Sequence, residues 1–496
     1  MANVDILIIG AGHNGLVAAS YLAKAGKSVL VLEQRDTAGG QLVPSGPQAL
    51  HASAQLRPDI ARELGVAVTA AGGPAPYVSL LPDGGTLRLS SATNDDATLQ
   101  SIRALSAKDA EAWPKFVAFM DKAAAFLDTA YRTPMPRLPN VDWRSDGLPL
   151  ASLVWKLRGL GKQDLFRVIR SLSMTSIEFT EEWFEHEQVR AAVGALGIHG
   201  VTLGSMSAGT GFVLIHHWLN RGGLGHRTGA DPQVLATALV AAAKSAGAQI
   251  RTSSPVERVL VEKMRAVGVR LAGGEEIRAS TVVSAADPRR TLLGLVGPEE
   301  LPPEFAWNAS SIRMRGSVAK VHVTTDGAHG LPEGTLVVAP TLKYLERAYD
   351  ASKYGEISQQ PYLEVTTAGK NVSIHFQFAP YQLRHGDWGT ARATVERIAI
   401  ETLAARYPTF RTSVQQVSTL TPLDLEQQFG LTEGDLNHGQ LILDQLMFMR
   451  PLPGYATGRT PVDGLFLCGS GIHGGGGISG AAGRNAARQI LKGSSN

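Results

Sequence analysis

The chain has 496 residues, enough for two to four domain-sized units and a large core. Its 47 Lys and Arg residues nearly balance its 44 Asp and Glu residues, and a formal charge of +3 gives nucleic acid no strong field. One cysteine excludes an internal disulfide framework, a cysteine-rich zinc site and a dithiol redox pair.

The N-terminal residues, MANVDILIIG, lack the basic region, apolar core and cleavage site of a secretory signal. The sequence also holds no run of about 18 apolar residues that would span a membrane. We therefore expect a cytoplasmic protein. Its 54 glycines lie between periodic segments of a chain that is 44% hydrophobic. They are therefore expected at turns of a folded structure and not in flexible linkers.

The first predicted elements are a strand at residues 5–9, a helix at 16–25 and a strand at 28–32. Together they form a βαβ unit. Glu33 ends the second strand, where its carboxylate would accept hydrogen bonds from a ribose.

The turn between the first strand and the helix reads G-x-G-x-x-G, with Gly10, Gly12 and Gly15. Glycine at these positions permits a tight bend, close approach of a pyrophosphate, and close packing of helix on strand. The positive end of the helix then faces the phosphates. In this context the motif predicts a dinucleotide site, the alternative being an ordinary glycine-rich turn.

The residues after Glu33 favour a flavin over a nicotinamide dinucleotide. Gly39 and Gly40 would let a second loop lie against the pyrophosphate. The series Glu33, Arg35, Gly39 and Gly40 resembles the extended flavin fingerprint of the glutathione-reductase-type fold. We expect FAD as the cofactor.

Two helical stretches follow. Residues 106–131 predict a helix that Ser106 caps through Asp109, with an apolar stripe that is best explained as core. Residues 153–172 combine five basic residues with apolar ones, a pattern that fits either a membrane-surface contact or a solvated face or oligomer contact. Gly159 and Gly161 interrupt this second stretch. Further on, the alternating segment GSVAKVHV predicts a strand that carries Lys320.

The C-terminal part contains a second G-x-G-x-x-G, at Gly469, Gly471 and Gly474, after a predicted strand at residues 464–468. A helix at about 480–491 follows, but no second strand and no ribose-binding acid. A second dinucleotide unit is therefore not expected. We interpret this loop as lying against the flavin ring, with the helix start directed at N1 and the C2 carbonyl. Cys468 beside it is expected to be a small packing residue.

Several segments resemble one family: IIGAGHNGLVAASYLAKAG, LEQRDTAGG, HASAQLRPDIARELG, SSPVERVLVEKMRAVGVRL, LDQLMFMRPLPG and LFLCGSGIHGGGGISGAAGRNAA. The chain resembles the phytoene desaturase-like FAD-dependent oxidoreductases, in the branch of pyridine nucleotide-disulphide oxidoreductase domain-containing protein two. One cysteine leaves no disulphide chemistry. Two departures, Gln41 where Arg is frequent and Gly474 where Pro is usual, leave the substrate open but not the cofactor.

The resemblance implies an α/β fold, with a Rossmann-like FAD-binding domain and an inserted α+β substrate domain. The FAD-binding domain would comprise residues 1–71, 223–296 and 421–496, and the substrate domain 72–222 and 297–420. Within the middle segment we predict a helix at 233–246 and strands at 249–252, 256–262, 267–271 and 281–285.

The resemblance also implies the site residues. Those expected to bind FAD are Gly10, Gly12, Asn14, Gly15, Glu33, Gln34, Arg35, Gly39, Gly40, Val256, Gly469, Ser470, Gly477 and Ile478. The expected catalytic residues are Lys320, which similarity to flavin amine oxidases would join through water to flavin N5, and His473 and His438 near the glycine loop. The alternatives are an exposed strand lysine and structural histidines. His216 and His217, in an apolar context, are expected to be core histidines, and no metal site is expected.

The implied function is an FAD-dependent dehydrogenase or desaturase. A hydride would pass from a C–H bond of a largely apolar, small or medium-sized substrate to flavin N5, with oxygen or a quinone as acceptor. A flavin amine oxidase is the first alternative, supported by Lys320 but opposed by Ile472, Gly476 and Ile478 where aromatic residues commonly flank the flavin. The second alternative is a redox-neutral isomerase or an interaction protein.

Overall fold

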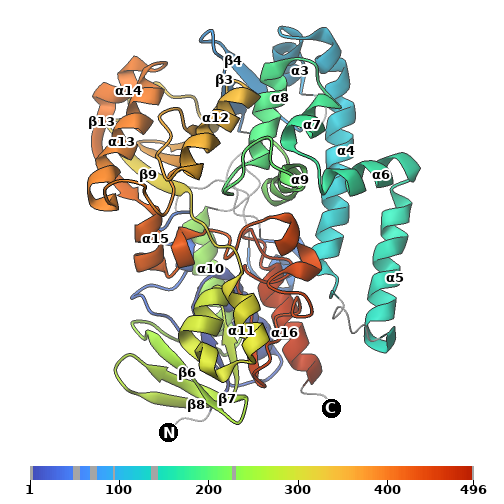
Figure 1. Cartoon of the computed structure of the whole chain (residues 1–496), viewed down its shortest axis with the longest axis vertical. Coiled ribbons are helices and arrows are strands. Elements are labelled where there is room, and N and C mark those ends of the chain that lie inside the picture. Colours follow the sequence, from blue (N-terminus) through green and yellow to red (C-terminus); the bar gives the residue numbers. More distant parts are fainter. Residues whose placement is uncertain are drawn as a thin grey trace.

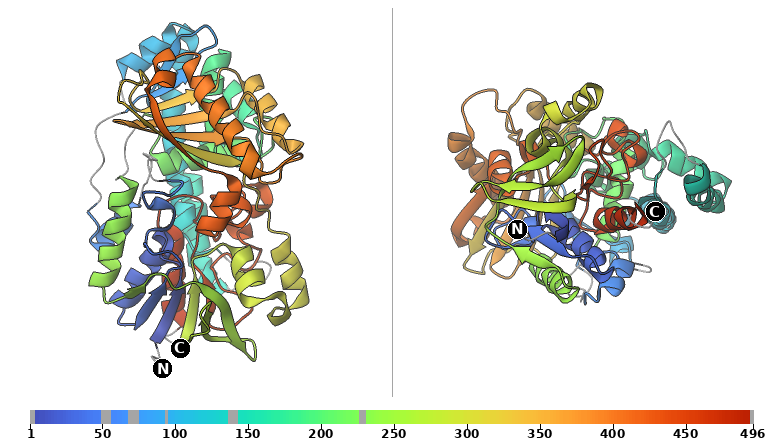
Figure 2. Two further views of the ribbon diagram at one scale, coloured as in Figure 1. Left: turned by 90° about the vertical axis from the view of Figure 1, so that its left-hand side faces the viewer. Right: turned by 90° about the horizontal axis from the view of Figure 1, so that it is seen from below.

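The structure is a computed structural model that describes residues 4–48, 56–67, 75–92, 95–135, 143–225 and 231–493. Two seven-stranded β-sheets lie toward opposite ends of the long axis, each with helices packed on it (Figure 1). The first and last elements of the chain, β1 and α16, belong to the same end, where both termini are marked, so the chain leaves this end and returns to it (Figures 1 and 2).

The first sheet has the strand order β5-β2-β1-β8-β7-β6, with β14 paired to β8. Its strands are β1 (Val4–Ile9), β2 (Val29–Leu32), β5 (Gln249–Arg251), β6 (Val256–Glu262), β7 (Arg265–Leu271), β8 (Glu276–Ser284) and β14 (Leu465–Leu467). β1 pairs in parallel with β2 and β8, β2 pairs in parallel with β5, and β8 pairs in parallel with β14. By contrast, β6, β7 and β8 form an antiparallel meander.

Helices cover the central parallel strands, which explains why β1 and β2 are almost entirely apolar. The helices α1 (His13–Lys24), α10 (Pro232–Ser245) and α16 (Ala481–Gly493) form one layer, with α1 between the other two. Small residues of α1 such as Ala18 and Ala19 allow this close packing. The strands and helices predicted at residues 5–32, 233–285 and 464–491 are confirmed, apart from shifts of up to five residues at their ends.

The second sheet has the strand order β13-β9-β12-β11-β10-β3-β4. Its strands are β3 (Tyr77–Leu80), β4 (Thr86–Leu89), β9 (Val318–Thr325), β10 (Thr335–Val338), β11 (Tyr362–Ala368), β12 (Asn371–Gln377) and β13 (Val414–Leu420). One face carries Ala319, Val321 and Val323 and packs against α13 (Trp388–Ala404) and α14 (Pro408–Ser413).

The opposite face of this sheet is polar. Lys320 of β9 pairs directly with His375 of β12, and His375 pairs with Glu364 of β11. Because side chains alternate between faces along a strand, these three residues form one row across three adjacent strands. All three are buried, so this part of the core contains ionisable side chains.

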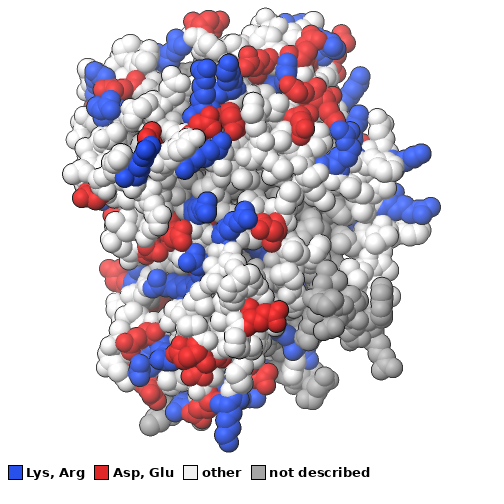
Figure 3. Space-filling model, viewed as in Figure 1, with Lys and Arg blue, Asp and Glu red and all other residues white. Residues whose placement is uncertain are grey.

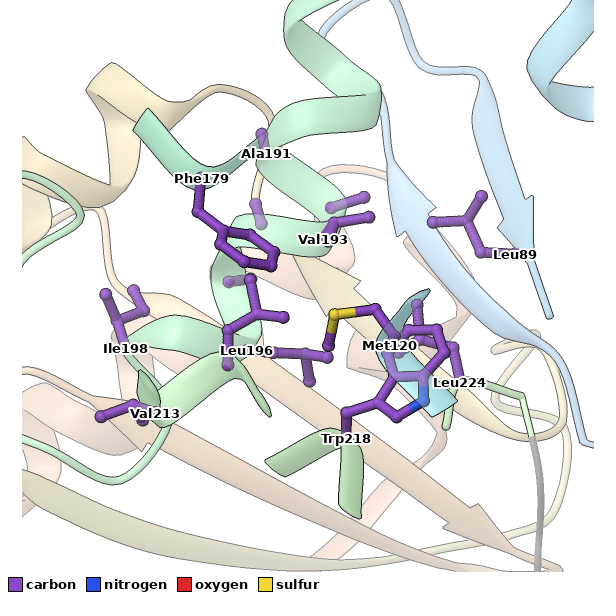
Figure 4. Close-up of a cluster of buried hydrophobic side chains, with 14 of the residues drawn as sticks. Leu89, Met120, Phe179, Ala191, Val193, Leu196, Ile198, Val213, Trp218 and Leu224 are labelled. Atoms are coloured by element: carbon purple, nitrogen blue, oxygen red, sulfur yellow. The ribbon is translucent and has the colours of Figure 1, made fainter. Parts of the chain in front are cut away.

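A helical layer packs over the second sheet around Trp218, Met120 and Phe179 (Figure 4). It contains α3 (Asp96–Arg103), α4 (Ala107–Arg132), α7 (Ser176–Glu181), α8 (Glu187–Gly194) and α9 (Thr210–Arg221). The backbone N–H of Asp109 donates to Ser106 Oγ at 3.1 Å, which confirms the predicted cap of α4. The predicted apolar stripe of α4 is core. The other helices are α2 (Pro58–Leu64), α11 (Pro303–Ser310), α12 (Leu342–Lys353) and α15 (Pro422–Phe429).

Two helices form an arm at the side of the molecule, α5 (Trp143–Gly159) and α6 (Lys162–Ser171) (Figure 1). They are separate helices, as the two predicted glycine interruptions require, and Gly161 begins α6 with φ +81°. The arm exposes large apolar side chains, with Leu148 at 83% and Trp155 at 77% exposure. Basic side chains project at its α6 end (Figure 3). None of the described helices is both long and apolar enough to cross a membrane.

Candidate active site

A cavity opens where β1 and β2 end at their carboxyl edge. In parallel α/β sheets this edge is where nucleotides bind. Ten of the predicted cofactor residues line it together: Gly10, Gly12, Asn14, Gly15, Glu33, Gln34, Arg35, Gly40, Val256 and Ser470. The cavity thus brings the first glycine loop, the acid at the end of β2, the start of β6 and the C-terminal loop to one place.

Glu33 is buried in the wall of this first cavity. Its Oε2 accepts a hydrogen bond from the backbone N–H of Ala11 at 2.7 Å, and its Oε1 accepts one from the backbone N–H of Arg35 at 3.0 Å. A carboxylate oxygen can accept more than one hydrogen bond, so both oxygens retain capacity for ribose hydroxyls. The two backbone hydrogen bonds therefore hold the carboxylate in place and leave each oxygen able to accept another.

The three glycines of the motif have different surroundings. A Cβ on Gly15 would lie 2.2 Å from Gly10 O, so this position is closed by the turn itself. A Cβ on Gly12 would meet nothing within 4 Å, although Gly12 lines the cavity and begins α1 without a side-chain cap. Open space beside an uncapped helix start is the arrangement that a diphosphate requires, so these residues fit a dinucleotide.

Four predicted cofactor residues lie outside the lining of the first cavity. Gly477 and Ile478 line a second, adjoining cavity. Gly39 lies beside the first loop, with its N–H donating to Ala11 O at 2.9 Å. A Cβ on Gly469 would lie 2.6 Å from Ala285 O. Neither of these two glycines lines a described cavity, and Gly469 lets two backbone segments approach closely.

The second cavity shares His13, Gln41 and Ser470 with the first. One side of it is the C-terminal glycine loop, with Gly476, Gly477 and Ile478. The other side comes from the helical layer and the second sheet: His199, Gly200, His217, Asn220, Arg221 and His375. The two predicted glycine clusters therefore meet at one pair of cavities.

The glycine loop is attached to the helical layer through His216 of α9. His216 Nε2 donates to Gly476 O at 2.7 Å, and the hydroxyl of Tyr131 lies 2.6 Å from its Nδ1. Burial lowers the pKa of His216 to about 4, so the ring is neutral at physiological pH. His216 is thus the satisfied core histidine that the sequence predicts, whereas its neighbour His217 lines the second cavity.

Lys320 is buried on the polar face of the second sheet and does not line either described cavity. Burial lowers its pKa to about 8, while Glu364 acts to raise it and Arg221 to lower it. The ammonium therefore remains mainly charged at pH 7 but loses its proton within about a unit of it. Lys320 is not the exposed strand lysine of the alternative interpretation.

The two other predicted catalytic residues lie in different surroundings. His473 is buried against α4, with Nε2 donating to Ala130 O at 2.9 Å, and lines neither described cavity. Burial lowers its pKa to about 4. His438 lines the first cavity, near His13. Its φ of +60° is rare for a non-glycine residue.

Sequence reasoning missed most of the polar wall of the second cavity. His199, Asn220, Arg221 and His375 carried no motif, and His217 was assigned to the core. One signal was present: Ser373, His375 and Gln377 are polar at every second position of β12, which marks a strand with one polar face. The sparse overall charge of the chain gave no sign of it.

Cys468 is buried in the core of the first sheet, and burial raises its pKa to about 12. It is a packing residue, as predicted, and cannot serve as a thiolate at neutral pH. Among the described residues, no group of three His, Cys, Asp or Glu side chains is arranged to hold a metal ion.

The fold and the first cavity define a dinucleotide-binding flavoprotein. The model of the family of flavin-containing amine oxidoreductases matches residues 15–376, and the chain belongs to this family. It is an FAD-dependent oxidoreductase, and it resembles the phytoene desaturase-like branch as predicted. The α/β fold with a Rossmann-like FAD-binding domain is likewise confirmed.

Individual relatives agree with this family. The chain is 32% identical to pyridine nucleotide-disulfide oxidoreductase domain-containing protein 2 of Rattus norvegicus over 98% of this chain and 93% of the relative. It is 24% identical to one of the subunits of limonene dehydrogenase from Castellaniella defragrans over 98% and 94%. The solved structure of cyclohexylamine oxidase from Brevibacterium oxydans shares the fold, with a TM-score of 0.54, 18% identity and full coverage of both chains.

Proposed function

We propose that the protein is a dehydrogenase of the desaturase type, which oxidises a small or medium-sized substrate with a largely apolar body at a C–H bond. The observation that carries this proposal is that the second cavity adjoins the first and shares His13, Gln41 and Ser470 with it. Bound FAD supplies the oxidation by accepting a hydride. The resemblance to a limonene dehydrogenase supports removal of hydrogen from an apolar skeleton.

We propose that the fourteen predicted cofactor residues hold FAD, ten of them from the lining of the first cavity, with Glu33 binding the ribose and the start of α1 facing the diphosphate. Lys320 is the proposed proton-handling residue, because its lowered pKa lets it give and take a proton near neutral pH. His438 is proposed to act at the cofactor's end of the site. The position of His473 against Ala130 supports a structural role for that residue.

The proposed domain boundaries are residues 1–71, 223–296 and 421–496 for FAD binding and 72–222 and 297–420 for the substrate. One feature supports a shift of the boundary at 297. Leu301, Phe305 and Ala309, in or next to α11, pack in the same cluster as Leu7 of β1 and Val259 of β6. The first domain is therefore proposed to extend through α11.

A flavin amine oxidase remains the second candidate, and the family model and the cyclohexylamine oxidase fold favour it. Against it, the described lining of the second cavity includes no Phe, Tyr or Trp side chain. We therefore rank dehydrogenation of a C–H bond first. Oxygen or a quinone is the proposed electron acceptor, because the described part of the chain holds one βαβ unit with a dinucleotide motif.

We place the protein in the cytoplasm, with peripheral contact to an anionic membrane surface through the arm of α5 and α6. The exposed Trp155, Val154 and Phe166 would enter the interface, and Lys162 and Arg170 would meet lipid phosphates. A second copy of the same arm would instead bring like charges together.

Anaerobic mixing with candidate substrates tests the proposed function. Bleaching of the flavin's visible absorption with formation of an alkene or ketone supports dehydrogenation. Release of ammonia or an aldehyde would assign the protein to the amine oxidases instead. A ligand that binds without any flavin reduction would leave the redox-neutral alternative.

A further inference from the structure

The wall of the second cavity that faces the glycine loop is built from polar side chains. His199, His217, Asn220, Arg221 and His375 converge on it from α9, the loop before it and β12. A cavity for a hydrocarbon would be lined by apolar side chains, because a polar group that loses water without a partner costs free energy. Such a wall is therefore better suited to a substrate that carries a polar group.

The imidazoles of this wall are held in fixed orientations. His217 Nε2 donates to His199 O at 2.8 Å, and the rings of His199 and His375 stack with their centroids 4.1 Å apart. His375 Nε2 donates to Gln377 Oε1 at 2.9 Å, and this oxygen also accepts from the N–H of Gly200 at 2.7 Å. A wall whose orientations are fixed before binding loses little entropy when a ligand arrives.

The charges behind the wall are unequal. Arg221 forms a bidentate ion pair with Glu364, with N···O distances of 2.8 and 3.0 Å. Lys320 lies on the same face of the sheet, one strand beyond His375. Among the described strand residues of this face, Glu364 is the one carboxylate. It faces two cations, Lys320 of the same face and Arg221 of α9. The face therefore carries one positive charge in excess.

A buried excess of positive charge is costly, and an anion in the adjoining cavity would offset it. The same charge would repel an ammonium group. His217 supports this polarity: burial lowers its pKa well below 6.5, and the positive charge of Arg221 lowers it further. Because Nε2 of His217 donates to His199 O, Nδ1 of the neutral ring carries a lone pair, and it can donate to a carboxylate only after the ring takes up a proton as the anion binds.

We infer that the substrate of this cavity carries a carboxylate, which binds at the wall of His217, Asn220 and Arg221 while its apolar body reaches toward the glycine loop. This inference rests on the proposed function and specifies its substrate class: an acid, in place of a plain hydrocarbon or an amine. The wall would then select and orient the molecule by its acid group, leaving a C–H bond of the body beside the flavin.

Four probes that differ only in their head group test this inference: hexanoate, 1-hexanol, hexylamine and hexane. Each is titrated into the FAD-loaded protein, and the visible spectrum of the bound flavin reports binding. Hexanoate is expected to saturate at a concentration about tenfold or more below that of the other three, a typical effect of one charge contact. Equal or tighter binding of hexane or hexylamine would overturn the inference.

Two variants sharpen the test. Lys320→Met is expected to weaken hexanoate about tenfold and to strengthen hexylamine, a reversal of sign that loss of structure would not produce. His217→Phe keeps an aromatic ring but removes the nitrogen, and is expected to weaken hexanoate with FAD content unchanged. His385→Phe, at an exposed histidine, is the matched control.

The two levels of the proposal fail separately. Absence of bound FAD, or of flavin reduction by any substrate, would count against the proposed function. Full FAD content and normal flavin reduction in the wild type, together with hexane as its tightest probe, would overturn the acid-binding wall alone. An unchanged order of the four probes in Lys320→Met would do the same.

Discussion

The backbone N–H of Ala11 donates to Glu33 Oε2 at 2.7 Å, which joins the glycine loop after β1 to the acid that ends β2. This contact fixes the carboxylate in the wall of the first cavity before any cofactor arrives. In the proposed site the acid would therefore have two functions, holding the loop that faces the diphosphate and presenting oxygens to the ribose.

Glu33→Ala is expected to purify with little FAD. Loss of hydrogen bonds to a charged acceptor costs about 1.5 to 3 kcal/mol, equivalent to a tenfold or greater loss of affinity. The ratio of visible flavin absorption to protein absorption measures the result. Glu111→Ala, at an exposed glutamate of α4, should retain its flavin. Full flavin content in Glu33→Ala would show that the ribose lies elsewhere.

The glycines of the first loop are expected to separate cofactor binding from folding. Gly12→Ala should fold normally, because φ is −71° and no protein atom lies within 4 Å of the new Cβ, yet it should lose FAD from the space that the methyl group enters. Gly15→Ala should also lose about 1 to 3 kcal/mol of stability through the clash with Gly10 O. Thermal unfolding and flavin content test this, and an FAD-replete Gly12→Ala would refute it.

The buried Lys320 is expected to make stability depend on pH. Its folded pKa of about 8 lies below the ordinary 10.5, so the unfolded chain binds more protons between these values and stability rises with pH across this window. Below pH 8 the loss of folding stability from burying the charged ammonium reaches its full value, about 3 kcal/mol at most by linkage. Lys320→Met should therefore be more stable than the wild type at pH 7, with the difference vanishing near pH 10.5.

Denaturant unfolding of both proteins at several pH values measures this difference. A constant difference would mean that the lysine is not buried as a charge. The catalytic proposal has its own readout, because Lys320→Met should slow flavin reduction or reoxidation. Unchanged rates in both half-reactions would remove that role.

The arm of α5 and α6 is expected to bind anionic membranes. The full-length protein should float with vesicles of phosphatidylcholine and phosphatidylglycerol but not with phosphatidylcholine alone. Trp155→Ser should reduce binding severalfold, because an interfacial tryptophan at 77% exposure is lost. Trp307→Ser, at a tryptophan of α11 with 70% exposure, is the control. Equal binding by both variants, or dimers in place of vesicle binding, would contradict the membrane contact.

Much of the FAD site could be predicted because its features are local. Gly10, Gly12, Gly15 and Glu33 lie within one βαβ unit, whose geometry follows from short-range strand and helix periodicity. His473 shows the limit of such reasoning. Its place inside a glycine loop suggested a catalytic position, but the turn of that loop directs the ring toward Ala130 of α4.

By itself the sequence determined the class of protein, the cofactor and the meeting of the two glycine clusters, since motif spacing and chain order record them. Only the tertiary structure decided the chemistry of the substrate's surroundings. Arg221 and Glu364 are 143 residues apart, and Lys320, His375 and Glu364 share a row only through the register of three strands. Sheet register and helix packing bring such residues together, and no local pattern in the chain encodes that contact.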